Sequence, residues 1–509
     1  MFWQTGRSRA GRAVFFLAVY ILLLLFFAVL HPIPIMDEDD VIYSVLSRPA
    51  IPIPGFWNPS RMLPELLMPL CGNLAAICAR IGFGSFVDCQ VFLLGALLSA
   101  FITAYVYAFR RLLEKRFDLD SFSSGCLSIL FLLLHFLIFR TDYSRNLHMF
   151  SSYDACCICY YTIPALLCCT LVMVFMAEPE DAVRIPEGLF HASVMILALY
   201  CAVFSNLFGS VILAAYAGCR FLRNLFKRKP WKNKAAGFWK DNAVLIGIVL
   251  FWLAAAVLEA TGGRAGGAVS AAAEGRVSLL SSLRMAVGSF CQRLLETNLL
   301  FRLILAACVV CGTAACVIRA DSKENRRFLN ACGGICVWGG ISTAFILILS
   351  AAASPGYAGR PQVIFPIIFC VFLLMLLAIC QILKRIPVAA CLLPIVLVFT
   401  CTMINTRFLT FADSNPLFID GRLAVKIEND IYGKVIEAAE AGETEVTVQV
   451  PKSWDLTANW PHNANIGNPI AEFFLKYGLI DHEITVYTEP SEEYNESFGI
   501  HPDVSRIVS

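Results

Sequence analysis

The chain has 509 residues, of which 58% are hydrophobic and only 15% are charged, and its mean hydropathy is +0.70. Soluble domains carry about 25% charged residues, so this composition excludes an ordinary soluble protein and indicates sequestered apolar segments. The 40 Lys and Arg residues nearly balance the 38 Asp and Glu residues, and the net charge of +2 gives no electrostatic argument for nucleic-acid binding.

Eleven segments are long and apolar enough to be transmembrane helices, each of which needs roughly 20 apolar residues. The first follows the basic stretch "GRSRAGR" and resembles a signal peptide. Its apolar run is too long and no clear small-x-small cleavage site follows, so we interpret it as an uncleaved anchor. The predicted spans are 13–30, 88–109, 122–139, 159–177, 189–204, 205–222, 243–258, 298–318, 330–351, 362–382 and 387–405.

The orientation of the spans follows from Lys and Arg, which favour short cytoplasmic loops. All basic loops fall on the side of the N-terminus only if the segment 189–222 is two short spans, broken near Ser205 and Asn206. The segment 62–82, which contains Glu65, must also not cross, and we interpret it as an interfacial or re-entrant helix. The basic loops are 110–116, 220–234, 319–327 and 383–385.

The predicted fold is therefore an α-helical polytopic membrane protein with about eleven transmembrane helices and a small extracytoplasmic α/β domain at the C-terminus. The membrane module comprises residues 1–406, with a first external loop at 31–87, and the C-terminal domain comprises residues 407–509. The periodicity of this tail predicts two helices and two strands. The helices are expected over 421–442 and 468–479, and the strands over 444–451 and 482–489.

Four consecutive acidic residues follow the first span at the external edge of the membrane: Asp37, Glu38, Asp39 and Asp40. Single acidic residues there are usually a solvated flank, but four in a row repel one another. The next residues, "VIYSVL", are apolar and predict a helix, so the cluster is expected at a helix N-terminus, where the dipole and free N–H groups stabilise carboxylates. An aspartate kept ionised and oriented in this way suits the role of a general base.

A proline-stiffened loop, "PIPGFWNPSRMLPELL", lies about 20 residues beyond the acidic cluster and contains Trp57 and Arg61. Aromatic faces stack on sugar rings, and arginine pairs with phosphate or carboxylate. Carboxylate, aromatic ring and arginine together at a water–lipid boundary fit a substrate that is half lipid and half sugar.

This layout resembles the GT-C superfamily of integral-membrane glycosyltransferases, whose first external loop carries a D-D, E-D or D-E motif and whose spans number around ten to thirteen. It is also similar to bacterial members with a "DDxxY…W…GR" pattern. The segment Asp39–Tyr43 matches the first part of that pattern, and Trp57 and Arg61 match the second. Ser60 stands where the pattern has glycine, which puts the tight turn in question but not the arginine.

The resemblance implies a polyprenyl-phosphate sugar as donor in the outer leaflet of the plasma membrane, and a cell-envelope glycan or lipid as acceptor. The expected reaction inverts the anomeric centre. Asp39 or Asp40 takes the proton from the acceptor hydroxyl, with Asp37 and Glu38 as second choices. We expect these last two residues, with Tyr43, Trp57 and Arg61, to contact substrate. The carboxylates could also hold Mg²⁺ or Mn²⁺, although no other ligand set is evident.

The leaving phosphate requires cations on the external side, and Arg360 in "SPGYAGRPQVIFP" is the best placed. Prolines and glycines make this connection short and stiff. For each of the other candidates, the favoured explanation is an interfacial arginine whose flexible side chain reaches toward water. These candidates are Arg140, Arg145, Arg264 and Arg276.

Two other functions fit part of the pattern. A transporter, flippase or polymerase of lipid-linked saccharides would have charged or broken helices at mid-membrane, and the break near Ser205 and Asn206 is the one feature of that kind. A non-catalytic envelope scaffold would not need the acidic cluster, Trp57 and Arg61 together.

Overall fold

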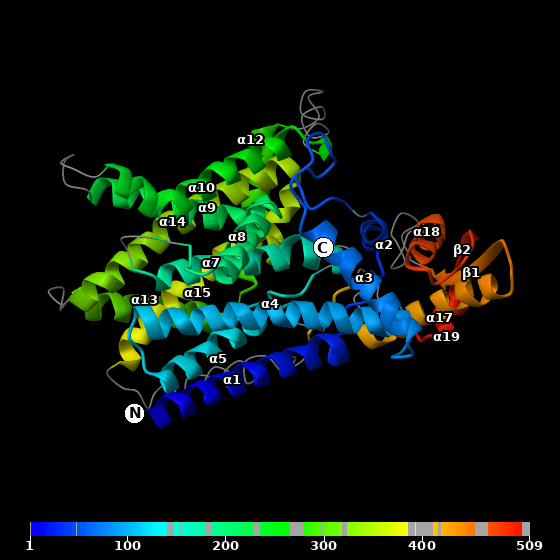
Figure 1. Ribbon diagram of the computed structural model, residues 1–509, viewed down its shortest axis with the longest axis horizontal. Coiled ribbons are helices and arrows are strands. Elements are labelled where there is room, and N and C mark those ends of the chain that lie inside the picture. Colours follow the sequence, from blue (N-terminus) through cyan, green and yellow to red (C-terminus); the bar gives the residue numbers. More distant parts are fainter. Residues whose placement is uncertain are drawn as a thin grey trace.

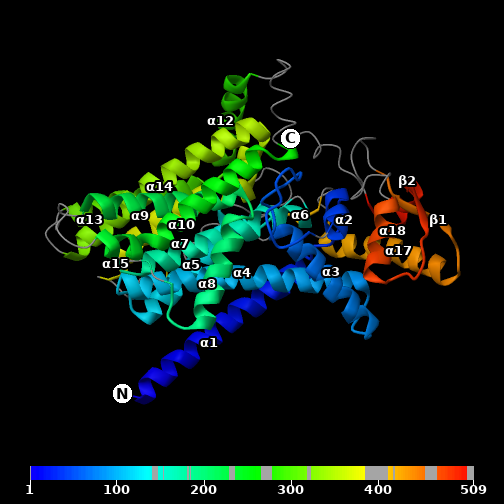
Figure 2. The same ribbon diagram turned by 45° about the horizontal axis from the view of Figure 1, so that its top comes forward.

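The computed structural model describes residues 2–46, 48–139, 147–152, 154–179, 183, 185–227, 235–264, 278–297, 299–317, 323–384, 392, 411–415, 419–452 and 467–500. These residues form a mostly helical protein with one small sheet near the C-terminus. Long helices lie side by side across the molecule, and the C-terminal unit packs at one end of them (Figures 1 and 2).

The bundle contains most of the helices and three shorter turns that connect them. Its first half comprises α1 (Phe2–Leu25), the π-helical turn η1 (Phe26–Leu30), α4 (Phe86–Arg116), α5 (Ser121–Leu137), α6 (Ala155–Cys157), the π-helical turn η2 (Ile158–Thr162) and α7 (Ile163–Ala177). Its second half comprises α8 (Leu189–Val203), α9 (Leu207–Lys227), α10 (Ala235–Ala260), α12 (Leu279–Leu295), α13 (Leu299–Val317), α14 (Lys323–Ala353), the 3₁₀ turn η3 (Pro355–Gly359) and α15 (Pro361–Leu383).

Six helical stretches in the described residues are long and apolar enough to cross a membrane, which is typical of a multi-pass membrane protein. They are Ala10–Leu30, Phe86–Arg116, Ala155–Ala177, Gly237–Ala260, Asn325–Ala353 and Pro361–Leu383. Each overlaps one predicted span. Two further predicted spans, 122–139 and 189–204, correspond to the shorter apolar helices α5 and α8. Two others, 205–222 and 298–318, fall in α9 and α13. The last predicted span, 387–405, lies outside the described residues except for residue 392.

The predicted break between two short helices is confirmed, because α8 ends at Val203 and α9 begins at Leu207. The buried side chain of Asn206 holds this break in place. Its Oδ1 accepts from the backbone N of Phe208 at 2.8 Å, and its Nδ2 donates to the carbonyl of Tyr160 at 2.7 Å. The side-chain amide thus satisfies backbone groups that the interrupted helices leave unpaired.

The segment 62–82 is helical, as predicted, over α3 (Pro64–Arg80). Its proline at the first helical position has no N–H, and none is needed there. The helix is not among the stretches long and apolar enough to cross a membrane. It packs on α4 and on α2 (Glu38–Val45), the short helix that begins in the acidic cluster.

One helix was not predicted: residues 279–295, between the predicted spans 243–258 and 298–318, form α12. This helix packs on η3 and α14. The signal was present but overlooked, because a set of apolar side chains recurs at three- and four-residue intervals and packs against the core. They are Leu283, Ala286, Phe290 and Leu294.

The C-terminal unit has the predicted helix–strand–helix–strand order. It comprises α17 (Gly421–Glu440), β1 (Glu445–Pro451), α18 (Gly467–Tyr477), β2 (Thr485–Ser491) and the short α19 (Glu492–Ser497). The two strands are parallel, with Val446 paired to Val486. Gly442 and Gly478 follow the two predicted helices with φ of +78° and +62°, a backbone conformation that favours glycine.

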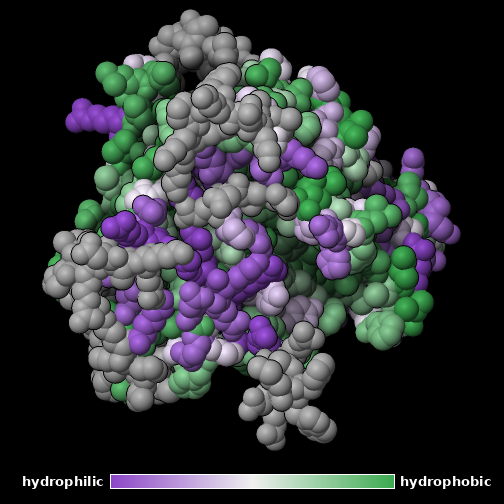
Figure 3. Space-filling model, turned by 60° about the vertical axis from the view of Figure 1, so that its left-hand side comes forward, coloured by the Kyte–Doolittle hydropathy of each residue, from purple (hydrophilic) through white to green (hydrophobic). Residues whose placement is uncertain are grey.

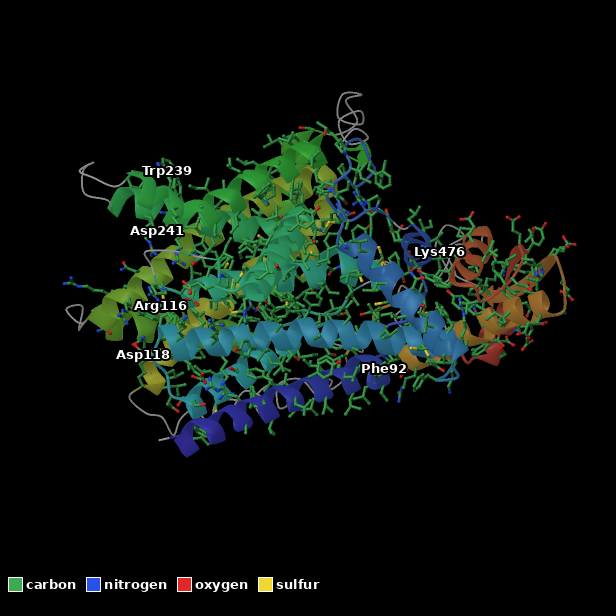
Figure 4. All side chains as sticks on the ribbon, viewed as in Figure 1. Phe92, Arg116, Asp118, Trp239, Asp241 and Lys476 are labelled. Carbon is green, nitrogen blue, oxygen red and sulfur yellow. The ribbon has the colours of Figure 1, made fainter. Side chains whose placement is uncertain are left out.

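The C-terminal unit docks on the segment that follows the first span. The Tyr477 hydroxyl at the end of α18 donates to the carbonyl of Ser44 in α2 at 2.8 Å, and Lys476 Nζ donates to the same carbonyl at 3.0 Å (Figure 4). A Cβ atom at Gly72 in α3 would lie 2.5 Å from the Tyr477 ring, so this close approach requires glycine. The acidic cluster and the C-terminal unit therefore lie at the same end of the bundle.

Candidate functional site

The acidic cluster starts α2, as the sequence predicts. Asp37 is the N-cap, and its Oδ1 accepts from the backbone N of Asp39 at 3.2 Å. In return, Asp40 Oδ2 accepts from the backbone N of Asp37 at 3.2 Å. This reciprocal pair is a capping box and satisfies N–H groups that the start of a helix leaves free.

Asp40 is fully buried, and both of its carboxylate oxygens accept backbone hydrogen bonds. Oδ2 also accepts from Met36 N at 3.1 Å, and Oδ1 accepts from Cys156 N in α6 at 2.6 Å. Burial, together with the neighbouring carboxylates of Asp154 and Asp37, raises the pKa of Asp40 well above its usual range. Asp40 therefore joins α2 to α6 and has no surface toward a substrate.

Asp154 is a member of this cluster that the sequence analysis did not single out. It is the N-cap of α6 and accepts from the backbone N of Cys157. Burial raises the pKa of Asp154 to about 7, although the hydrogen bond from Cys157 opposes the shift. The signal in the sequence was a single aspartate directly before the apolar run "ACCICYY".

Asp39 differs from its described neighbours because its side chain is exposed, whereas Asp37 and Asp40 are buried. Partial desolvation raises the pKa of Asp39, and the positive charge of Arg264 opposes this shift. Burial thus opposes the stabilisation of the ionised form that the helix N-terminus was expected to provide. The side chain of Glu38 lies outside the described part of the chain.

A buried ion pair fixes the loop after α2. Arg48 Nη1 lies 2.9 Å from Glu65 Oε2, and Arg48 Nη2 donates to the carbonyl of Pro59 at 2.9 Å. Glu65 Oε1 accepts from the Tyr160 hydroxyl at 2.7 Å. The loop that carries Trp57 and Arg61 is thus held on one side by α3 and on the other by η2.

Arg61 projects from this loop into the interior. Its guanidinium carbon lies 5.4 Å from the centre of the Tyr160 ring, and Tyr161, Tyr357 and Glu259 are within electrostatic range. The side chain is buried, yet its guanidinium forms no hydrogen bond or ion pair with any described residue. Five N–H donors in a partly desolvated position favour an anionic ligand.

Arg264, four residues beyond the C-terminal end of α10, lies against the loop that carries Trp57 and Arg61. The backbone N of Gly263 donates to Phe56 O at 3.1 Å, and that of Arg264 donates to Trp57 O at 3.3 Å. A Cβ atom at Gly262 would lie 2.6 Å from Pro59, so glycine permits the two segments to approach. Trp57 itself is exposed at the edge of the site.

Arg360 follows the turn η3, and the stiff connection predicted from its prolines and glycines is present. Its guanidinium carbon lies 4.6 Å from the centre of the Tyr357 ring, which in turn is 6.2 Å from the Tyr161 ring. Arg360 is half-buried and, among the residues that the structure describes, its guanidinium forms no hydrogen bond or ion pair. Arg61 and Arg264 also lie within electrostatic range of Tyr161.

The structure thus brings Arg61, Arg264 and Arg360 around the Tyr161 and Tyr357 rings, with Asp39 beside Arg264. Tyr43, another predicted contact, packs against the Tyr160 ring with the ring centres 5.1 Å apart and the planes tilted by 58°, and its hydroxyl accepts from Asn58 Nδ2 at 3.4 Å. The candidates Arg140, Arg145 and Arg276 lie outside the described residues. No group of three or more His, Cys, Asp or Glu side chains in the described ranges has the geometry to hold a metal ion.

This arrangement is a cationic site next to an exposed carboxylate whose pKa is raised. It can bind an anion on the arginines and accept a proton on Asp39. No protein-family model, curated protein or solved structure matches this chain.

Proposed function

We propose that the protein is an integral-membrane glycosyltransferase of the GT-C type, which transfers a sugar from a polyprenyl-phosphate donor to a glycan or lipid acceptor of the cell envelope. The observation that supports this best is the convergence of three arginines around the Tyr161 and Tyr357 rings, with the exposed Asp39 in electrostatic range of Arg264. Two of the arginines, Arg61 and Arg360, have no hydrogen bond or ion pair of the guanidinium among the described residues. A lipid phosphate provides the anion, and an acceptor hydroxyl provides the proton.

In the proposed reaction, Asp39 accepts the proton of the acceptor hydroxyl as its oxygen attacks C1 of the sugar. The C1–O bond to the lipid phosphate breaks, and the phosphate leaves with the electron pair. Configuration at C1 inverts because attack and departure occur on opposite faces. Arg61, Arg264 and Arg360 stabilise the charge that develops on the phosphate.

The structure favours Asp39 over Asp40 as the base. A general base must reach the proton that it removes, and Asp39 is exposed whereas Asp40 is enclosed with both oxygens engaged. A raised pKa also suits a base, since catalysis is most efficient when that pKa lies near the working pH. Asp40 and Asp154 then have the role of joining α2 to α6.

We further propose that the chain crosses the plasma membrane about eleven times, with its N-terminus in the cytoplasm and its C-terminal domain outside. In support, Arg116 at the basic end of α4 lies at the end of the bundle opposite the site, far from Lys476 of the C-terminal unit (Figure 4). Lys and Arg favour the cytoplasmic side.

A transporter or flippase of lipid-linked saccharides is the second candidate. The break between α8 and α9 favours it, because Asn206 contacts Tyr160 directly beside the arginine cluster. Such a protein would move the donor without breaking its C1–O bond.

The decisive experiment measures release of polyprenyl phosphate from polyprenyl-phosphate sugars by the purified full chain in lipid nanodiscs, with envelope glycans as acceptors. Asp39→Asn should reduce transfer by roughly 10²–10⁴. Asp118→Asn is the matched control, since Asp118 is an exposed aspartate at the other end of the molecule (Figure 4). Equal transfer by wild type and Asp39→Asn would refute the proposed mechanism, and translocation without release would favour the flippase.

A further inference from the structure

A cavity of about 90 Å³ lies at the end of the bundle opposite the acidic cluster. It is lined by the C-terminal ends of α4, α7 and α9 and by the N-terminal half of α14. Figure 3 looks toward this end and shows hydrophilic residues gathered across it. One water needs at least about 10–15 Å³ by this measure, so the cavity has room for a group of several atoms.

The lining of the cavity is strongly cationic. Among the residues that the structure describes, it contains Arg116, Arg220 and Arg223 and one carboxylate, that of Glu178. Glu178 is already paired with two cations: Lys115 Nζ lies 2.7 Å from its Oε1 and Arg111 Nη2 lies 3.2 Å from the same oxygen. Glu178 is therefore engaged by two cations outside the cavity lining, and it forms no ion pair with Arg220.

Arg220 is the most deeply placed of the three arginines, with 5% of its surface exposed. Its Nη1 donates to Phe175 O and to the Tyr216 hydroxyl, both at 2.6 Å. Its Nε is buried and has no hydrogen-bond partner among the described residues. Backbone and hydroxyl oxygens thus hold Arg220 as a cation without a carboxylate, and a buried charge of this kind is costly unless an anion accompanies it.

One wall of the cavity is aromatic. The Tyr216 and Trp338 rings pack edge to face with their centres 6.0 Å apart, and Trp338 is 3% exposed. Arginines on one side and buried rings on the other suit a ligand with a phosphate group and an apolar portion.

We propose that this cavity is an anion site that binds a phosphate group, separate from the proposed donor site at the opposite end. Arg116, Arg220 and Arg223 contact the phosphate oxygens. Two sources share this chemistry: the head group of an anionic phospholipid and free inorganic phosphate. Basic pockets between helices at a membrane surface are suited to anionic lipid head groups.

The test measures the thermal stability of the purified full chain in neutral detergent, with three separate titrations. The probes are short-chain phosphatidylglycerol, short-chain phosphatidylcholine and inorganic phosphate. A lipid site predicts stabilisation by phosphatidylglycerol well below the concentration at which phosphatidylcholine or phosphate acts. A free-phosphate site predicts that inorganic phosphate acts at least as well as phosphatidylglycerol.

Arg223→Gln and Arg116→Gln should each lower the affinity for the stabilising probe about fivefold, as expected for loss of one cation near a phosphate. Arg12→Gln is the matched control: it removes one charge from the partly exposed pair that Arg12 forms with Glu114, outside the cavity lining. Using two variants guards against misfolding of one, and Arg220 is left intact because it holds backbone carbonyls. Equal responses to all probes, or unchanged affinity in both folded variants, would overturn the proposal.

Discussion

Arg48 and Glu65 form an ion pair whose side chains are only 2% and 3% exposed, with Nη1 and Oε2 2.9 Å apart. The remaining donors and acceptors are largely used, because Arg48 also donates to Asn58 O at 2.7 Å and Glu65 accepts from Tyr160. This pair links the loop that carries Arg61 to α3 and η2, so the position of Arg61 depends on it.

Arg48→Met should destabilise the folded protein by about 3–5 kcal/mol, because it leaves the Glu65 carboxylate buried without its cation. Arg422→Met is the control, since Arg422 pairs with Asp420 at the surface and its loss should change the melting temperature little. Melting of the purified variants in detergent measures both. If Arg48→Met and Arg422→Met lower the melting temperature by the same small amount, the loop is held by contacts other than the Arg48–Glu65 pair.

Asp39→Asn and Asp40→Asn should have opposite consequences. Loss of the exposed carboxylate removes the proposed base and leaves the fold intact, so transfer falls and melting is unchanged. Asp40→Asn replaces a carboxylate oxygen by an NH₂ group that faces backbone N–H donors, so it should lower stability by about 1–3 kcal/mol. A stable, inactive Asp40→Asn with an active Asp39→Asn would reverse our assignment.

Asp154→Asn should change how stability depends on pH. The pKa of Asp154 is about 7 in the folded protein, against about 3.9 for an unfolded aspartate. The folded state therefore binds more protons between these values, and its stability falls as pH rises from about 4 to 7. Asparagine lacks this titration and can still accept from Cys157 N. The variant should thus melt close to wild type at pH 4.5 and above it at pH 8, and a constant offset at both values would contradict this.

Arg360→Lys should impair use of the donor with little loss of folded protein. Lysine keeps the charge, but it lacks the planar fork that can bind two phosphate oxygens. We expect a higher KM for the polyprenyl-phosphate sugar in Arg360→Lys and a larger rise in Arg360→Ala. Arg284→Lys is a control in α12 outside the arginine cluster. If the donor dependence of Arg360→Lys is normal, Arg61 and Arg264 must bind the phosphate without it.

The proposed orientation predicts which introduced cysteines react from outside the cell. Glu443→Cys in the C-terminal domain should react with a membrane-impermeant maleimide in intact cells, and Arg326→Cys at the start of α14 should react only after lysis. Both positions are exposed. The parent should carry Cys291→Ser and Cys336→Ser, because these two are the exposed cysteines of the described ranges. Labelling of position 326 in intact cells would contradict the proposed orientation and indicate the opposite one.

The sequence was sufficient to predict features that depend on local chemistry. Prolines and glycines predicted the turn before Arg360, alternation and helical periodicity predicted the C-terminal unit, and the acidic cluster predicted the start of α2. The positive-inside rule predicts Asp39, Arg264 and Arg360 on one side of the membrane, and the structure brings Asp39 within electrostatic range of Arg264.

What the sequence could not provide depends on contacts between distant segments. The role of Glu65 as partner of Arg48, and of Asp40 as acceptor for Cys156, arises only when α2, α3 and α6 meet. Burial then decides the protonation of the aspartates, and burial is a property of the packed molecule. The helix α12 was overlooked because its polar residues hid a regular apolar face.

The length of α4 has a consequence for the geometry of the whole protein. Its 31 residues extend about 46 Å, about 16 Å more than a hydrocarbon layer is thick. Near one end Asp88 accepts from Asn429 of the C-terminal unit at 3.3 Å, and at the other Arg116 lines the cationic cavity. The continuous helix α4 therefore sets the position of the C-terminal unit along the helix axis and its rotation relative to the bundle. Each residue added to it would shift that unit by about 1.5 Å and turn it by about 100°.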